Sequence, residues 1–304
     1  MRTTQKPGSA ASNHPLSENP IVPAPFTSLV SVHELAAQAT PAWRIFDCRF
    51  NLADPPAGRQ AYAAGHLPGA FFLDLNEDLS GPLSGLNGRH PLPDPQLLAE
   101  KLGSLGVGPE TQVVAYDDAG GMFASRLWWL LRWFGHTRVA VLNGGIQAWA
   151  GSGHPLVTER PEAVATRFTP KLQKCMRADA DYVHSHLGSP GMLLIDARAP
   201  DRFRGENETL DPVGGHIPGA INRFFRDNLD ANGCFKQAAC LQEEFGKLIK
   251  GGDAHAVVHQ CGSGVTACHN LLAMEVAGLS GAKLYAGSWS EWCSDPARPI
   301  ATGP

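Results

Sequence analysis

The chain has 304 residues, of which 43% are hydrophobic and 18% charged, and its formal net charge is -4. This length and composition predict about two globular domains, and the slightly acidic balance argues against a nucleic-acid partner. The longest apolar runs, 127–134 and 271–277, are shorter than the about 18 residues of a membrane-spanning helix, so we expect no membrane association.

The first 25 residues are rich in Ser, Pro and Asn and contain no apolar core, which predicts a disordered tail at 1–25 and not a secretory signal. The seven cysteines include no C-x-x-C pair. This pattern is typical neither of a disulfide framework nor of a thiol oxidoreductase. We therefore expect a cytoplasmic protein, with a mitochondrial location as the alternative.

The segment 26–156 alternates short apolar strands with helical stretches. Strands are expected at 44–49, 112–116 and 138–142, and a helix at 125–134. Such alternation is typical of an α/β fold with a mainly parallel sheet. The following segment, 157–176, contains Pro and charges of both signs, so we expect a surface linker there.

The segment 177–304 repeats the first half. Gly-His-Leu-Pro-Gly-Ala at 65–70 recurs as Gly-His-Ile-Pro-Gly-Ala at 215–220, and each copy follows an apolar strand that ends in Asp-x-Arg. We expect the acid–arginine pairs to be internal ion pairs and the two histidines to fix turns. The acid–arginine pairs are Asp47 with Arg49 and Asp196 with Arg198. The sequence therefore predicts a duplicated domain.

Cys261 opens the run Cys-Gly-Ser-Gly-Val-Thr-Ala between the apolar stretch 256–258 and a helical segment, 268–277. A thiol at the start of a helix faces unpaired N–H groups and the positive end of the helix dipole, both of which favour the thiolate. The small residues that follow allow the backbone to curl round the sulfur. The sequence therefore predicts an anion-binding loop with a nucleophilic cysteine.

The two halves differ at this position, because Asp117 stands in the first half where Cys261 stands in the second. Only the second half is therefore expected to be chemically active. A non-catalytic binding module is an alternative. Asp117 in the first half favours it, and Cys261 in the second half argues against it. A cysteine phosphatase is disfavoured, because its C-x5-R motif would need an arginine where Ala267 stands.

From about residue 26 to 300, the chain resembles the tandem-domain rhodanese superfamily of sulfurtransferases. The resemblance is carried by the two Gly-His-x-Pro-Gly-Ala turns, Trp128-Trp129, Gly144-Gly145, the cysteine loop and the run 287–292. It implies an inactive N-terminal domain at 26–156 and a catalytic C-terminal domain at 177–304. It also implies that Cys261 accepts a sulfane sulfur as a persulfide and passes it to thioredoxin, glutathione or cyanide, without a cofactor.

In this family the residues after the cysteine vary with the sulfur donor. Members that use thiosulfate resemble Cys-Arg-Lys-Gly-Val-Thr, and members that use 3-mercaptopyruvate resemble Cys-Gly-Ser-Gly-Val-Thr, as here. The resemblance thus implies 3-mercaptopyruvate, with thiosulfate as the alternative. The residues expected to bind substrate are Gly262, Gly264, Val265 and Thr266, and Ser263 is expected to help move the donor's proton. His184 and His186 lack a further ligand at metal-binding spacing, so no metal site is expected.

Arg202 occupies the position of the family's substrate arginine, and its guanidinium suits a carboxylate. The family pattern places a second arginine about nine residues later, where this chain has Asp211. This departure predicts a weaker grip on pyruvate and keeps thiosulfate open as the donor. His66 matches a family histidine that lines the cleft between domains, and we expect it to donate to the substrate.

Overall fold

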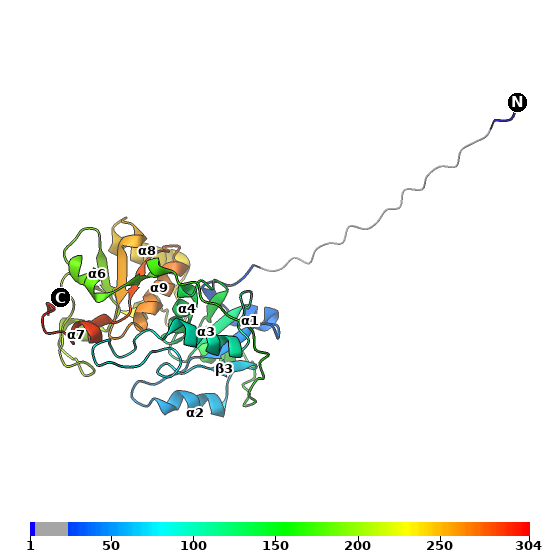
Figure 1. The fold of residues 1–304 in the computed structure, drawn as a ribbon, viewed down its shortest axis with the longest axis horizontal. Helices are drawn as coiled ribbons and strands as arrows, with labels where there is room; N and C mark the ends of the chain where they lie inside the picture. Colours follow the sequence, from blue (N-terminus) through cyan, green and yellow to red (C-terminus); the bar gives the residue numbers. More distant parts are fainter. Residues whose placement is uncertain (4–23) are drawn as a thin grey trace.

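The computed structural model describes residues 1–3 and 24–304, so most of the predicted tail at 1–25 lies outside the described residues. Figure 1 shows two α/β domains side by side, with the N-terminal half in blue to green and the C-terminal half in yellow-green to red. Within the described residues, no helix has the length and apolar character needed to cross a membrane.

The first domain is built on a parallel five-stranded sheet in the order β1-β5-β4-β2-β3. Its strands are β1 (Leu29–Val30), β2 (Arg44–Asp47), β3 (Ala70–Phe72), β4 (Val113–Tyr116) and β5 (Val139–Leu142). Its helices are α1 (Val32–Gln38), α2 (Pro56–Ala64), α3 (Pro95–Ser104), α4 (Ala124–Trp133) and α5 (Gly145–Gly151). The central strand β4 is apolar and fully buried because side chains pack on both of its faces.

The second domain repeats this sheet, in the order β6-β10-β9-β7-β8, and all its pairings are parallel. The strands are β6 (Arg177–Ala178), β7 (Leu193–Asp196), β8 (Ile221–Asn222), β9 (Val257–Gln260) and β10 (Lys283–Tyr285). The helices are α6 (Ala180–Ser185), α7 (Pro200–Arg204), α8 (Ala238–Ile249), α9 (Thr266–Val276) and α10 (Ser288–Trp292), with short 3-10 turns at Lys174–Met176, Phe225–Asn228 and Ala254–Ala256. The matching strand orders confirm the predicted α/β duplication.

The two domains share one hydrophobic core. Helix α4 of the first domain packs directly against α9 of the second, in the middle of the folded part of the chain in Figure 1. A single cluster of buried side chains contains Trp129 and Leu130 from α4 together with Leu271 and Leu272 from α9. The start of α9, which follows the cysteine loop, is therefore held against the first domain.

The segment between the halves lies along the first domain. Thr166 donates its backbone N–H to the carbonyl of Gly103 at 2.8 Å, and Lys171 donates to the carbonyl of Phe134 at 2.8 Å. Phe168 is buried and packs near Phe134. The segment thus crosses the surface of the first domain before β6 begins.

The predicted internal ion pairs are confirmed in both domains. Arg49 contacts Asp47 at 2.6 Å and Arg198 contacts Asp196 at 2.7 Å, and all four side chains are buried. Each arginine also donates to the carbonyl oxygen that precedes the histidine of its Gly-His turn, at 2.7 Å. These pairs tie the end of a central strand to the neighbouring turn.

Asp117 occupies the position in the first domain that Cys261 occupies in the second. Its carboxylate accepts backbone N–H groups from Ala119, Gly121, Phe123 and Ala124 at 2.7–2.9 Å. These donors belong to the loop that precedes α4 and to the first residue of α4. The carboxylate therefore caps the N-terminus of this helix. The first domain therefore fills its anion-binding loop with its own side chain.

We expect Asp117→Asn to reduce the free energy of unfolding by about 3 kcal/mol, because an amide offers one acceptor oxygen for donors that a carboxylate satisfies with two. Urea unfolding monitored by circular dichroism measures the effect. Asp118→Asn is the control, since Asp118 is exposed, and it should change stability by less than about 0.5 kcal/mol. Equal stability of the two variants would contradict the capping role.

His269 in α9 connects the two domains. Its Nε2 donates to the carbonyl of Gly120 in the first domain at 3.0 Å, and its Nδ1 lies 3.2 Å from the side-chain amide of Asn228. Because that amide is a donor, the ring is neutral with its hydrogen on Nε2. Burial lowers the pKa of His269 to about 4.

This histidine predicts an acid-sensitive contribution to folding. The pKa of His269 is lower in the folded protein than in the unfolded chain, so its contribution is complete above about pH 6.5 and is lost as the pH falls towards 4. We expect wild-type protein to lose about 2–3 kcal/mol more stability than His269→Gln between pH 7 and pH 4.5. Urea unfolding of both proteins at each pH measures this difference. Equal losses of unfolding free energy in the two proteins would contradict a contribution of His269.

Candidate active site

Cys261 follows β9 and begins the loop that leads into α9. Its side chain is buried, with 2% of the residue exposed. Its N–H donates to the hydroxyl of Ser288 at 3.1 Å, and its sulfur accepts the N–H of Gly264 at 3.1 Å. Ser288 has a φ of 57°, a left-handed conformation that is uncommon for a non-glycine residue, so the loop rests on a strained turn at the start of α10.

Gly264 gives the loop its curvature. Its φ is +76°, and a Cβ atom at this position would lie 2.3 Å from the carbonyl oxygen of Ala286. Glycine is therefore required both for conformation and for space. Within residues 24–304, the N–H groups of Gly262, Ser263 and Val265 have no hydrogen-bond acceptor, so they remain available for an anion at the sulfur.

A cavity of about 170 Å³ opens above the sulfur and is lined by both domains. It brings together most of the predicted site residues, namely Cys261, Gly262, Ser263, Val265, Thr266 and Arg202. Gly264 does not line the cavity and contributes its N–H from below. The first domain adds Arg89, His90 and an apolar wall that includes Met122 and Phe123.

Two guanidinium groups from different domains lie beside the loop. A Cβ on Gly262 would lie 2.7 Å from Nη2 of Arg89 and 3.6 Å from Nη2 of Arg202. Asp211 forms ion pairs with both, with Arg89 through Nη1 and with Arg202 at 3.4 Å. Glu208 pairs with Arg202 at 2.9 Å. Asp211, which the sequence placed where a second arginine was expected, thus anchors an arginine that comes from the other domain.

The charges around the two guanidiniums are closely balanced. Burial raises the pKa of Glu208, but the hydrogen bonds from Arg202 outweigh it and leave that pKa below its usual range. Arg198, which is also buried, pairs with Asp196 and contacts Glu208 at 3.5 Å. Three arginines therefore face three carboxylates, so the cavity suits a small anion of low charge.

His90 and Ser263 form a hydrogen-bonded pair across the domain interface. Nδ1 of His90 lies 2.7 Å from the hydroxyl oxygen of Ser263. Burial lowers the pKa of His90 to about 3, and the charges of Arg126 and Arg89 act in the same direction. His90 is therefore neutral at neutral pH, and it can exchange a proton with Ser263 without carrying a resting charge.

His66 was expected to contact the substrate, and the structure places it elsewhere. Its ring is buried, lies 3.9 Å from the ring of Tyr62, and its nitrogens contact the carbonyls of Tyr62 at 2.8 Å and Glu159 at 3.1 Å. His216 occupies the same place in the second domain, 3.8 Å from the ring of Phe203. The expectation for His66 is wrong, because both of its ring nitrogens fix a turn outside the cavity.

The sequence did not single out Arg89 and His90. They lie in the irregular stretch between β3 and α3, which has no counterpart motif in the second half, and nothing in their local pattern indicates that they cross to the other domain. The only sequence signal is a pair of basic residues inside a loop rich in Gly, Pro and Ser. Their position depends on the packing of the two domains.

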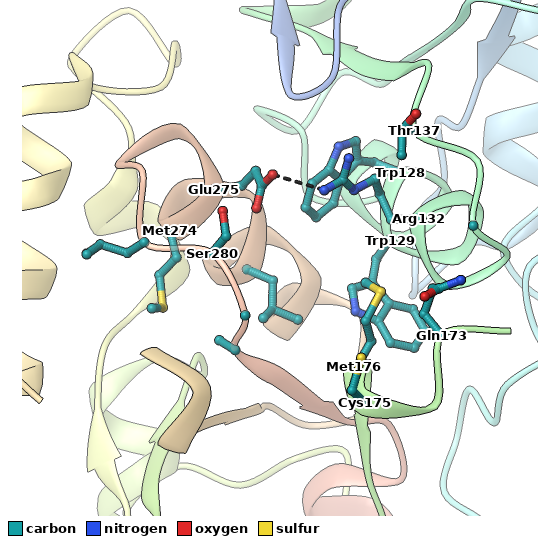
Figure 2. Close-up of a pocket in the computed structure, with 15 residues that line it drawn as sticks. Trp128, Trp129, Arg132, Thr137, Gln173, Cys175, Met176, Met274, Glu275 and Ser280 are labelled. Carbon is teal, nitrogen blue, oxygen red and sulfur yellow. Dashed lines mark hydrogen bonds and ion pairs between the residues drawn. The ribbon is translucent and has the colours of Figure 1, made fainter. Parts of the chain in front are cut away.

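A larger hollow, of about 390 Å³, lies at the other end of α4 and α9. Figure 2 shows that Arg132 of α4 reaches across it to Glu275 of α9, with Trp128 and Trp129 on the same side as Arg132. The ion pair measures 3.0 Å. This hollow contains no residue of the Cys261 loop, so its size alone does not make it the reactive site.

The site combines a thiol, backbone N–H donors, two guanidiniums and a neutral histidine–serine pair. Such a set suits nucleophilic attack by sulfur on a small anionic molecule. Within the described residues, no group of three or more His, Cys, Asp or Glu side chains is arranged to hold a metal ion.

Comparisons with known proteins agree with this fold. The rhodanese-like domain family matches twice, at residues 31–152 and 179–295. The chain is 47% identical over 278 residues to a protein of Pseudomonas aeruginosa named "Probable 3-mercaptopyruvate sulfurtransferase", covering 90% of this chain and 98% of the relative. It is 35% identical over 266 residues to the thiosulfate sulfurtransferase of Bos taurus, covering 84% and 87%.

Solved structures show the same likeness. SseA of Escherichia coli, described with the rhodanese fold of 3-mercaptopyruvate sulfotransferases, superposes with a TM-score of 0.74 at 31% identity, covering 87% of this chain and 99% of that chain. The 3-mercaptopyruvate sulfurtransferase of Leishmania major superposes with a TM-score of 0.77 at 29% identity, covering 88% and 74%. The chain therefore belongs to the rhodanese family and carries two rhodanese domains in tandem.

Proposed function

We propose that this protein is a sulfurtransferase that takes sulfur from 3-mercaptopyruvate onto Cys261 as a persulfide and passes it to a thiol or to cyanide. The observation that carries the proposal is the contact of 3.1 Å between the Cys261 sulfur and the Gly264 N–H, at the floor of a cavity that holds two guanidiniums. The name of the Pseudomonas aeruginosa relative supports the same donor.

The proposed transfer begins with attack of the Cys261 thiolate on the donor sulfur. The new sulfur–sulfur bond forms while the sulfur–carbon bond of 3-mercaptopyruvate breaks, and the electron pair of that bond leaves on carbon as the enolate of pyruvate. The donor thiol gives up one proton and the enolate carbon gains one, so the products are a persulfide anion and pyruvate. An acceptor thiolate or cyanide then attacks the outer sulfur and releases Cys261 as a thiolate.

The His90–Ser263 pair is placed to move that proton. Ser263 lines the cavity and its hydroxyl contacts neutral His90 at 2.7 Å. A neutral imidazole accepts a proton through the serine hydroxyl and returns it to the enolate. We assign Ser263 and His90 to this proton transfer, and the N–H groups of the loop, from Gly262 to Thr266, to stabilisation of the persulfide.

Arg202 and Arg89 are the proposed carboxylate binders. Both guanidiniums line the cavity and are held by Asp211 from behind, which fixes their direction before substrate arrives. Because three carboxylates balance the nearby arginines, the site suits the singly charged carboxylate of 3-mercaptopyruvate better than a dianion. We propose that Asp211 supports substrate binding by fixing both guanidiniums, in place of the weakening expected from the sequence.

Thiosulfate is the second candidate donor. It is favoured by the same two guanidiniums and by the name of the Bos taurus relative. The loop itself, however, has glycine and serine at 262 and 263 and so adds no cation for a dianion. Rates with each donor, with cyanide as the common acceptor, separate the two proposals.

The acceptor is proposed to be a small thiol such as glutathione, a protein thiol such as thioredoxin, or cyanide. All seven cysteines are free thiols in the structure, which supports a reducing compartment, and we propose the cytoplasm. The first domain is proposed to be inactive, because Asp117 takes the place of the nucleophile and its carboxylate already occupies the loop donors.

Cys261→Ser should reduce sulfur transfer at least about 1000-fold, because a serine hydroxyl cannot form the persulfide. Wild-type protein incubated with 3-mercaptopyruvate alone should gain the mass of one sulfur atom on the peptide that contains Cys261. Cys240→Ser, at an exposed cysteine of α8, should behave as wild type. Turnover retained by Cys261→Ser would remove this residue from the mechanism.

Arg202→Ala should lower kcat/KM for 3-mercaptopyruvate by about 30- to 1000-fold, the effect of losing a charged hydrogen-bonded contact worth about 2–4 kcal/mol. Arg202→Lys should recover part of the loss, because lysine keeps the charge but not the planar pair of donors. The matched control is Arg204→Ala on the same helix, since Arg204 pairs with Glu206 at the surface. Equal kinetics for the Arg202→Ala and Arg204→Ala variants would assign Arg202 to the surface.

A further inference from the structure

Arg126 is a fully buried cation for which the described part of the chain provides no carboxylate partner. It lies in α4, with none of its surface exposed. Its guanidinium donates to four carbonyl oxygens, at 3.1–3.4 Å, and the Cys268 thiol also lies within hydrogen-bonding reach. The acceptors are the carbonyls of Leu79, His90, Pro91 and Gly264. A buried charge destabilises the fold unless an opposite charge lies close to it. A role other than packing would account for the presence of Arg126 at the domain interface.

The ionisable groups beside Arg126 are two thiols and a histidine. Burial lowers the pKa of Arg126, whereas the neighbouring Cys268 and Cys261 act in the opposite direction. Burial raises the pKa of Cys268 to about 12, so Cys268 remains a neutral thiol and its sulfur lies 3.3 Å from the Gly264 carbonyl. His90 is neutral as well. Of these groups, Cys261 is the one that the proposed sulfur transfer requires as an anion.

Arg126 also contacts the loop residue that faces the sulfur. Its Nη1 donates to the carbonyl of Gly264 at 3.2 Å, and the N–H of the same glycine donates to the Cys261 sulfur at 3.1 Å. The N–H and the carbonyl of Gly264 thus contact two different groups, the sulfur and the guanidinium. A guanidinium fixed on the carbonyl side holds the N–H side towards the sulfur.

We propose that Arg126 is a positioning residue that supplies, from the other domain, the buried positive charge opposite the anionic Cys261 and orients Gly264 towards the sulfur. The inference deepens the proposed sulfur transfer and rests on it, since both the thiolate and the persulfide are anions. Arg126 does not line the cavity, so it acts through the loop and not on the substrate.

Other charged groups also face the cysteine loop. From the cavity side these are Arg89 and Arg202 with their partner Asp211, and from β7 they are Arg198 and Asp196. Each of those arginines forms an ion pair with a carboxylate, whereas Arg126 does not. Removing Arg126 therefore changes the charge beneath the loop without deleting any arginine of the cavity.

The test is the pH dependence of Cys261 alkylation by iodoacetamide, followed by mass spectrometry of the peptide that contains Cys261. Alkylation requires the thiolate, and it needs no sulfur donor. In Arg126→Met the midpoint of the rate profile should move to higher pH by about one unit or more, because the anion loses its buried cation. Arg126→Lys, which keeps the charge, should stay within about 0.5 unit of wild type.

Arg132→Met is the matched control, because Arg132 lies two turns further along α4 and its ion pair with Glu275 also joins the domains. Arg132→Met tests whether a weaker contact between the domains is enough to shift the midpoint of the alkylation profile, and we expect no shift. Near-ultraviolet circular dichroism checks the fold of each variant. If Arg126→Met does not fold, Arg126→Gln replaces it, since Gln is neutral and retains an amide donor for one of the carbonyls.

An unchanged midpoint in a folded, neutral Arg126 variant overturns the inference, as does an equal shift in Arg132→Met. Neither result affects the proposed function, which is judged by persulfide formation on wild-type Cys261. Conversely, a wild-type protein that takes no sulfur from either donor refutes the proposed function, while the alkylation profiles still report on Arg126.

Discussion

The packing of α4 against α9 is the contact on which the rest of the molecule depends. It joins two similar domains through one hydrophobic core, and it sets the start of α9 against residues of the first domain. The cysteine loop lies at that start. Every group that the second domain cannot provide, including Arg89, His90 and Arg126, reaches the loop across this interface. The duplication thus produces a site that neither half contains alone.

The loop that precedes α4 in the first domain and the equivalent loop that precedes α9 in the second have different roles. In the second domain the loop donors surround a cysteine sulfur, and in the first they are satisfied by the carboxylate of Asp117. A loop filled by its own side chain has no capacity for an external anion, but it makes a firm base for α4. Under the proposed function, the first domain has no nucleophile of its own and supports the cysteine loop of the second domain.

The fold and the position of the cysteine loop could be predicted from the sequence because their signals are local. The repeated turns, the Asp-x-Arg strand ends and the glycine-rich run after Cys261 are each read within a few residues. The cavity could not be predicted in the same way, because Arg89 and His90 come from an irregular loop with no repeated counterpart. One error came from matching a position without its surroundings. His66 was assigned in this way, although backbone carbonyls contact both of its ring nitrogens. The ion pair between Asp211 and Arg89 could not be read from the sequence either, because the two residues belong to different domains.

The volume of the cavity, about 170 Å³, bears on the order in which the sulfur donor and the acceptor bind. A space this small, below the usual range for drug-sized ligands, matches a three-carbon acid in scale. Under the proposed function, we expect donor and acceptor to use this space in turn. Turnover would then follow a double displacement, with a sulfur-loaded protein between two separate encounters.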